Sequence, residues 1–137
     1  RDRNKQEGDK KTPRGYFKLG NLYFREDRHV KPDTKLKTIP IKKDMGWCDD
    51  VRSKKYNKLI KISKKINHEK LTRKDSNYDF LIPINYNTNK IKSGKGSAIF
   101  LHITKNYKKT LGCVAIKKKD MLILLKLVKK NSTIKIF

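Results

Sequence analysis

The sequence predicts a mainly β fold with a minor helical part. Short apolar runs bounded by Gly, Pro, Asn and Asp recur along the 137 residues, as expected for short strands joined by turns. Residues 120–130 alone place apolar side chains at clear helical spacing, and residues 134–136 alternate as a final strand does. Many short strands with one clear helix indicate a single mainly β domain over residues 1–137.

The helix has the clearest signals. Its apolar residues recur at the spacing of one helix face: Met121, Leu122, Leu124, Leu125 and Val128. Asp120 comes where an acidic side chain favours a helix start, several lysines follow near the expected end, and Asn131 is a candidate stop signal.

The other expected elements are shorter. Strands are expected at residues 16–25 with a break at Gly20, near 36–42 within long loops over 26–58, at 78–86 and at 98–103. Pro83 indicates the edge of a sheet or the end of a strand, because proline cannot donate a ladder hydrogen bond. One or two helical turns are expected from Glu69 to Arg73, with Asn67 as a candidate N-cap.

The chain is strongly basic. It has 37 Lys and Arg against 13 Asp and Glu, a formal net charge of +24, which predicts attraction to nucleic acid, anionic lipid or cell-wall polymer. Only seven of these residues are Arg, the side chain that nucleic-acid readers favour for base edges and phosphates. Because AT-rich codons encode Lys, Asn and Ile, genome composition explains the lysines equally well. The charge alone therefore does not decide the function.

Several classes of protein and site are disfavoured. No apolar run approaches the roughly 18–20 residues of a membrane-spanning helix. The chain begins at Arg1 without an apolar leader segment. Cys48 and Cys113 do not form a CxxC pair, and no histidine lies at a metal-ligand spacing from them, so we expect no metal site. The two cysteines could form one disulfide or remain two independent thiols.

The chemistry-bearing residues lie late in the chain. His102 lies in the apolar run AIFLHI, and Cys113 follows in TLGCVA. A neighbouring imidazole is the usual means of converting a thiol to the nucleophilic thiolate, and Gly112 lets the backbone approach a substrate closely. The alternative is that Cys113 is a small buried hydrophobic side chain and His102 a histidine of the core. For Cys48, the expectation is a packed thiol beside Trp47.

The sequence resembles the catalytic domain of the L,D-transpeptidase (YkuD-like) family. The matching segments are GSAIFLHI at 96–103 and T-x-G-C-V-A at 110–115, with a T-P-x-G-x-[FY]-like segment within 7–17. Further segments are similar to a subgroup of short members: GWCDD at 46–50, YN at 56–57 and 86–87, and YD at 78–79. The resemblance implies a β-sandwich of mixed sheets. It also implies that one or two strands that precede the T-P-x-G segment in such domains are missing from this chain.

The resemblance implies a reaction. It makes Cys113 the nucleophile and His102 the base, oriented by a main-chain carbonyl beside it, with the amides of Leu111, Gly112 and Cys113 as oxyanion donors. The implied substrate is a peptidoglycan stem peptide, and the thioester acyl-enzyme passes to an amine in 3→3 cross-linking or to water in carboxypeptidase trimming. No cofactor is implied. A bacterial periplasmic or cell-envelope location and a role in cell-wall biogenesis and cell shape follow from the substrate.

Weaker expectations concern the surrounding residues. Supporting roles are expected for Ser97, Ile103 and Thr110, and contacts to the substrate for Trp47, Tyr86, Asn87, Lys105, Lys108 and Lys109. The lysines are candidates to replace the family's arginine, because Ala115 stands at its position. Glu69, Arg73 and Asp75 form either a charge network near the site or ordinary ion pairs.

Two other functions are kept as alternatives. Aromatic residues interleaved with basic ones, as at Tyr16, Phe17, Tyr23 and Phe24, are typical of a basic module that binds nucleic acid or an anionic polymer. An inactive family member is the second alternative, because the arginine equivalent is absent and Leu111 replaces a second family histidine. Whichever function holds, we expect the protein to be a monomer.

Overall fold

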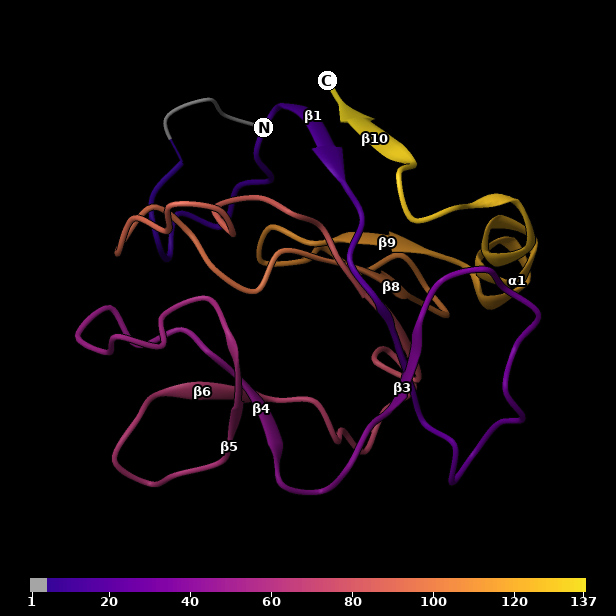
Figure 1. Ribbon diagram of the computed structural model, residues 1–137, viewed down its shortest axis with the longest axis horizontal. Helices are drawn as coiled ribbons and strands as arrows, with labels where there is room; N and C mark the ends of the chain where they lie inside the picture. The colour runs from indigo at the N-terminus through magenta and orange to yellow at the C-terminus, as the bar shows by residue number, and fades with distance from the viewer. Residues whose placement is uncertain (1–4) are drawn as a thin grey trace.

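The computed structural model describes residues 5–137, in which strands predominate and one helix lies near the C-terminus (Figure 1). The strands are β1 (Gly15–Lys18), β2 (Leu22–Phe24), β3 (Thr38–Pro40), β4 (Met45–Cys48), β5 (Leu59–Lys61), β6 (His68–Lys70), β7 (Phe80–Pro83), β8 (Phe100–Ile103), β9 (Val114–Ile116) and β10 (Thr133–Ile136). The helix, α1, spans Lys118–Leu127. The mainly β fold class, the C-terminal helix and the final strand are confirmed.

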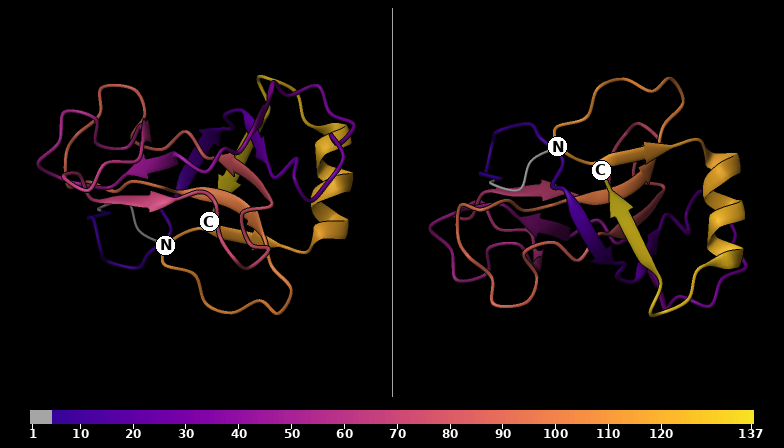
Figure 2. Two further views of the ribbon diagram at one scale, coloured as in Figure 1. Left: turned by 90° about the horizontal axis from the view of Figure 1, so that it is seen from below. Right: turned by 90° about the horizontal axis from the view of Figure 1, so that it is seen from above.

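A mixed five-stranded sheet forms the centre of the molecule, with the strand order β3-β2-β7-β8-β9. The outer pairs β2–β3 and β8–β9 are parallel, whereas β2–β7 and β7–β8 are antiparallel. A three-stranded sheet, β5-β4-β6, lies on the side of the molecule away from α1 (Figures 1 and 2). The antiparallel pair β1–β10 brings two segments from opposite ends of the chain together.

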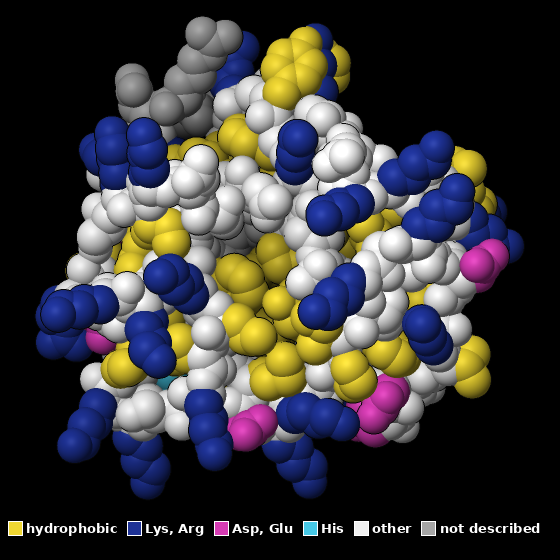
Figure 3. Space-filling view, in the orientation of Figure 1, with side chains coloured by type: hydrophobic (Ala, Val, Ile, Leu, Met, Phe, Trp, Pro, Cys, Tyr) yellow, Lys and Arg dark blue, Asp and Glu magenta, His cyan; other side chains and the backbone are white. Residues whose placement is uncertain are grey.

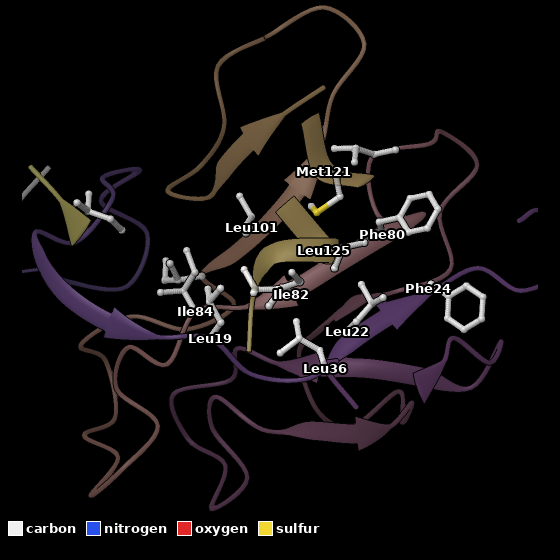
Figure 4. Close-up of a cluster of buried hydrophobic side chains, with 14 residues drawn as sticks. Leu19, Leu22, Phe24, Leu36, Phe80, Ile82, Ile84, Leu101, Met121 and Leu125 are labelled. Carbon is white, nitrogen blue, oxygen red and sulfur yellow. The ribbon is translucent and has the colours of Figure 1, made fainter. Parts of the chain in front are cut away.

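Alternating side chains of the five-stranded sheet enter two different cores, because successive residues of a strand point to opposite faces. One core packs Met121 and Leu125 of α1 against sheet residues that include Leu22, Ile82 and Leu101 (Figure 4). The other core lies on the opposite face and contains Tyr23, Trp47, Leu71, Tyr78, Leu81 and Phe100. Within β8, Phe100 and His102 therefore share the second face.

The observed strands follow the expected pattern in several places. The strand expected at 16–25 breaks around Gly20 into β1 and β2, β3 lies within 36–42, and Pro83 ends β7. The helix is placed correctly but begins at Lys118 and ends at Leu127, where Val128 turns to an extended conformation before Asn131 is reached. Asp120 lies in its first turn, as expected.

The helical turns expected from Glu69 to Arg73 are wrong. Residues 68–70 form β6, whose backbone pairs with β4 through Gly46↔Lys70, Trp47↔Glu69 and Cys48↔His68. The carbonyl of Arg73 accepts hydrogen bonds from the guanidinium groups of Arg25 and Arg28, at 2.9 and 3.2 Å. Ladder and side-chain bonds therefore satisfy the backbone groups that a helix would have used.

Basic side chains are distributed widely over the surface. Figure 3 shows Lys and Arg side chains spread across one face rather than gathered into one patch, with few Asp and Glu among them. In residues 5–137, no helix is long and apolar enough to cross a membrane.

Truncating Leu125, one of the buried residues of α1, should destabilise the protein. Leu125 is fully buried, so Leu125→Ala should lower the free energy of unfolding by about 2–5 kcal/mol, through lost burial and a residual cavity. Ile123 on the same helix is 53% exposed, so Ile123→Ala should change that free energy by about 0.5 kcal/mol or less. Urea unfolding followed by circular dichroism measures both, and equal losses would contradict the assigned helix face.

Candidate active site

The parallel pairing of β8 with β9 brings Cys113 and His102 to one face of the sheet. Leu101 lies opposite Val114 and His102 opposite Ala115, so Cys113, just before β9, lies beside Phe100. The Phe100 amide donates to Cys113 Sγ at 3.4 Å. Because Phe100 and His102 are two residues apart in one strand, the thiol and the imidazole lie on the same side.

A cavity of about 980 Å³ opens over this face. Its lining includes both reactive residues and, of the residues expected to support or bind, Ser97, Lys105, Lys108, Lys109, Thr110 and Leu111. One side is formed by the connection between β8 and β9, residues 104–113, which stands away from the body of the molecule in both views of Figure 2. Parallel neighbours cannot be joined by a tight turn, so this crossover has to be long.

His102 is held as a neutral imidazole with one defined tautomer. The residue is only 5% exposed, and Nδ1 lies 2.9 Å from the carbonyl oxygen of Ile103. A carbonyl can only accept, so Nδ1 carries the proton and Nε2 keeps its lone pair. Burial lowers the pKa of His102, which keeps the ring neutral and able to accept a proton at neutral pH.

Cys113 is held as a neutral thiol. Its Sγ donates to the carbonyl oxygen of Ala98 at 3.3 Å while accepting the Phe100 amide. Burial raises the pKa of the thiol to about 12, and the charge of Glu69 contributes in the same direction. The Phe100 amide and the charges of Lys5 and Arg73 oppose the shift, but burial outweighs them.

The turn before Cys113 depends on glycine. Gly112 has φ +125°, and a Cβ there would lie 2.8 Å from the carbonyl oxygen of Lys11. The Thr110 hydroxyl closes the turn by donating to the Cys113 carbonyl at 2.7 Å, and it accepts the Gly112 amide at 3.4 Å. The segment that contains Lys11 therefore supports the turn that carries the thiol.

A buried asparagine supports the opposite side of the thiol. Asn57 Oδ1 accepts the Ala98 amide at 3.1 Å and Trp47 Nε1 at 2.8 Å, and its Nδ2 donates to the carbonyls of Tyr86 and Asn87. Ala98 has φ +53°, an unusual conformation for a residue with a Cβ. Asn57 thus stabilises the strained backbone of Ala98, whose carbonyl oxygen accepts the hydrogen bond from the Cys113 thiol.

Ser97 joins the N-terminal segment to the site. Its hydroxyl donates to Glu7 at 2.5 Å, and Glu7 also accepts the hydroxyl of Tyr56 at 2.7 Å. The Tyr56 oxygen in turn accepts the Gly96 amide at 2.9 Å. These bonds fix the backbone immediately before Ala98.

Acidic side chains line the cavity despite the basic composition of the chain. Burial raises the pKa of Glu69 and of Asp49, and the negative charge of Glu7 adds to both shifts. Glu69 accepts the hydroxyl of Tyr78, which burial also keeps protonated by raising the pKa of the phenol. Arg73 forms a bidentate pair with Asp75, which lowers the pKa of that carboxyl.

Three residues expected to contact the substrate lie outside the cavity lining. Trp47 is buried against Tyr23 and Phe100, with ring centroids 6.4 and 5.3 Å away. The Tyr86 hydroxyl donates to the Lys95 carbonyl, and the Asn87 amide donates to the carbonyls of Lys92 and Gly96. Trp47, Tyr86 and Asn87 thus hold loops and core together in this structure.

Sequence reasoning assigned no role to Asn57 or Tyr78, although both belong to segments that carry the family resemblance. Asn57 is a polar side chain directly after Tyr56, and this local sequence does not indicate that it will be buried and make several hydrogen bonds. The signal in each case is its motif, Tyr56-Asn57 and Tyr78-Asp79. In residues 5–137, no three His, Cys, Asp or Glu side chains gather as they would to hold a metal ion.

A side chain at position 112 should destabilise the turn. Gly112→Ala combines a positive φ with a 2.8 Å approach to backbone, so the free energy of unfolding should fall by about 1–3 kcal/mol. Gly94→Ala is the matched control, because Gly94 has φ +81° but no atom within 4 Å of the added Cβ. Urea denaturation of both variants tests this, and an equal loss would exclude the close contact as the cause.

The reactivity of the free thiol should depend steeply on pH. Because burial raises the pKa of Cys113 to about 12, alkylation by iodoacetamide should keep rising about tenfold per pH unit beyond pH 9, where an ordinary cysteine levels off. Mass spectrometry of the Cys48→Ala variant, which leaves one thiol, follows the rate. A plateau below pH 9 would contradict a buried neutral thiol.

Comparison with known proteins identifies the family of this chain. The family model of the L,D-transpeptidase catalytic domain (YkuD) matches residues 3–136. Neither the curated proteins nor the solved structures include a significant match to this chain. Since the family match covers nearly the whole sequence, the chain belongs to the L,D-transpeptidase catalytic domain family.

Proposed function

We propose that the protein is a cysteine-dependent L,D-transpeptidase that acts on peptidoglycan stem peptides through a thioester acyl-enzyme. The observation that carries the proposal is that a thiol and a neutral histidine from two paired strands face one cavity. His102 Nδ1 is occupied by the Ile103 carbonyl, which leaves the lone pair of Nε2 for proton transfer. The family match supports the reaction class.

Acylation requires the buried thiol to lose its proton. In the proposed reaction, His102 Nε2 takes the Cys113 proton as Sγ attacks the carbonyl carbon of the third stem residue. The C–N bond to the terminal D-Ala then breaks, and His102 returns the proton to the leaving amine. A neutral imidazole beside a neutral thiol suits this sequence, because the base is free before substrate arrives.

The oxyanion formed during the attack needs hydrogen-bond donors. The amides of Leu111, Gly112 and Cys113 are the proposed donors, since each such bond typically lowers the barrier by about 3 kcal/mol. The Gly112 amide donates to Thr110 at 3.4 Å in the resting structure, a long bond that an oxyanion can replace. The same donors serve the second step, in which an amine or water attacks the thioester and Sγ leaves.

Lysines at the cavity provide candidates for carboxylate recognition. Lys105, Lys108 and Lys109 lie in the crossover loop that lines the cavity, while Ala115 occupies the position of the family's arginine. A lysine offers a flexible point charge rather than a bidentate fork, so we expect looser carboxylate recognition than an arginine gives. The dispersed basic surface adds attraction to the anionic cell envelope, which salt screens.

A β-lactam of the carbapenem class tests the nucleophile directly. Wild-type protein should gain the mass of one carbapenem, and the adduct should persist in Cys48→Ala but disappear in Cys113→Ala. His102→Gln should slow formation of the adduct by about 10²–10⁴-fold, the usual contribution of a general base. Intact-mass spectrometry measures all four proteins.

Turnover on defined muropeptides separates the remaining alternatives. A tetrapeptide donor should lose its terminal D-Ala and yield a cross-linked dimer with an amine acceptor or a tripeptide with water. An adduct without turnover would identify an inactive family member. Absence of both, together with tight, salt-sensitive binding to DNA, would favour the basic binding module.

A further inference from the structure

Tyr78 connects the two reactive residues to the rest of the cavity wall. It lies between Arg73 and β7, is 5% exposed, and lines the cavity. Its ring contacts His102 with centroids 5.3 Å apart at an angle of 64°, and it contacts Phe100 at 5.6 Å. Phe100 is the residue whose amide donates to the Cys113 thiol. One ring therefore packs against His102 and against Phe100, the residue that donates to the Cys113 thiol.

The Tyr78 ring is itself fixed by polar contacts on two sides. Its hydroxyl donates to the carboxylate of Glu69 on β6. The guanidinium carbon of Arg73 lies 4.9 Å from the ring centroid, a cation–π arrangement. Asp75 accepts a hydrogen bond from Arg73 at 2.7 Å, and both side chains of this pair are partly exposed at the rim of the cavity.

The segment that carries Tyr78 is anchored from a distant part of the chain. Asp79 accepts Arg28 at 2.9 Å, and His29 Nε2 lies 2.8 Å from its other carboxylate oxygen. Arg28 also donates to the carbonyl of Asp75 at 2.8 Å. These bonds hold residues 73–79 in an irregular conformation for which no repeating backbone ladder exists.

We propose that Tyr78 is a positioning residue for His102 and that Glu69 holds it in place. The Ile103 carbonyl engages a single imidazole nitrogen, and a single bond leaves the ring free to tilt about it. The Tyr78 ring restricts that tilt and excludes water from the same side. The inference rests on the proposed function, because the orientation of His102 matters for turnover only if this residue transfers protons.

The expected consequence is a loss of rate rather than of substrate binding. Misplacing a catalytic group by about 1 Å can reduce a rate about a hundredfold. Tyr78→Leu should therefore lower kcat by about tenfold to a hundredfold and leave KM nearly unchanged. It should also admit water to the ring, so that the pKa of His102 rises towards its ordinary value of 6.5.

The decisive measurement is an NMR titration of histidine-labelled full-length protein, which requires no substrate. His102 should titrate at higher pH in Tyr78→Leu than in wild type. Arg73 lowers the pKa of His102 and Asp75 raises it; both residues are retained in this variant, and burial is the largest cause of the lowered pKa. Tyr16→Leu is the control, because Tyr16 is 69% exposed and its ring lies under the ammonium group of Lys135, outside the cavity lining.

A second pair of variants tests the hydrogen bond without removing the ring. Glu69→Gln keeps an oxygen that accepts the Tyr78 hydroxyl, whereas Glu69→Leu removes it. We expect wild-type titration of His102 in the first variant and a raised pKa with reduced kcat in the second. If Tyr78→Leu also disturbs the His29 and His68 signals, the fold has changed in that variant. The comparison of Glu69→Gln with Glu69→Leu then tests the proposal in its place.

The proposal is overturned if folded Tyr78→Leu matches Tyr16→Leu in both His102 titration and kcat. It is equally overturned if Glu69→Gln and Glu69→Leu both behave as wild type. Failure of the proposed function is a separate result, since wild-type protein would then show no turnover while the titration still reports how Tyr78 affects His102.

Discussion

The parallel pairing of β8 with β9 is the constraint on which the site depends. A register of β9 shifted by one residue would turn Cys113 to the helix-facing core, away from His102. The observed register places both on the face that opens to the cavity, and it gives the thiol a hydrogen bond from the Phe100 amide. The long crossover required by parallel strands then becomes one side of the cavity.

Buried polar contacts hold the backbone around that pair in conformations it would otherwise leave. Ala98 and Gly112 both have positive φ, which strains an alanine but not a glycine, and both lie against distant parts of the chain. Asn57 accepts the Ala98 amide, while the carbonyl of Lys11 leaves no room for a side chain at Gly112. Strain of this kind persists only when surrounding structure over-determines it, which explains why distant segments converge here.

The electrostatics of the cavity differ from those of the surface. The chain carries a net charge of +24, yet the cavity lining that holds Cys113 and His102 also includes the acidic residues Glu7, Asp49 and Glu69. Burial dominates over these charges, because it raises the pKa of the Cys113 thiol and lowers that of the His102 imidazole. Both side chains of the candidate pair therefore rest in the neutral state, and the environment of the cavity differs from that of the basic surface.

The sequence by itself determined the mainly β class and the helix near residues 120–130, and it singled out Cys113 and His102 as the candidate reactive pair. Those signals are local: apolar spacing, turn residues and a short motif with His102 and Cys113. Only the tertiary structure decided that residues 68–70 form a strand, that Trp47 and Asn57 are buried supports, and that Tyr78 packs on His102. These features depend on contacts between segments tens of residues apart, and no local pattern encodes which partner a polar or aromatic side chain will meet.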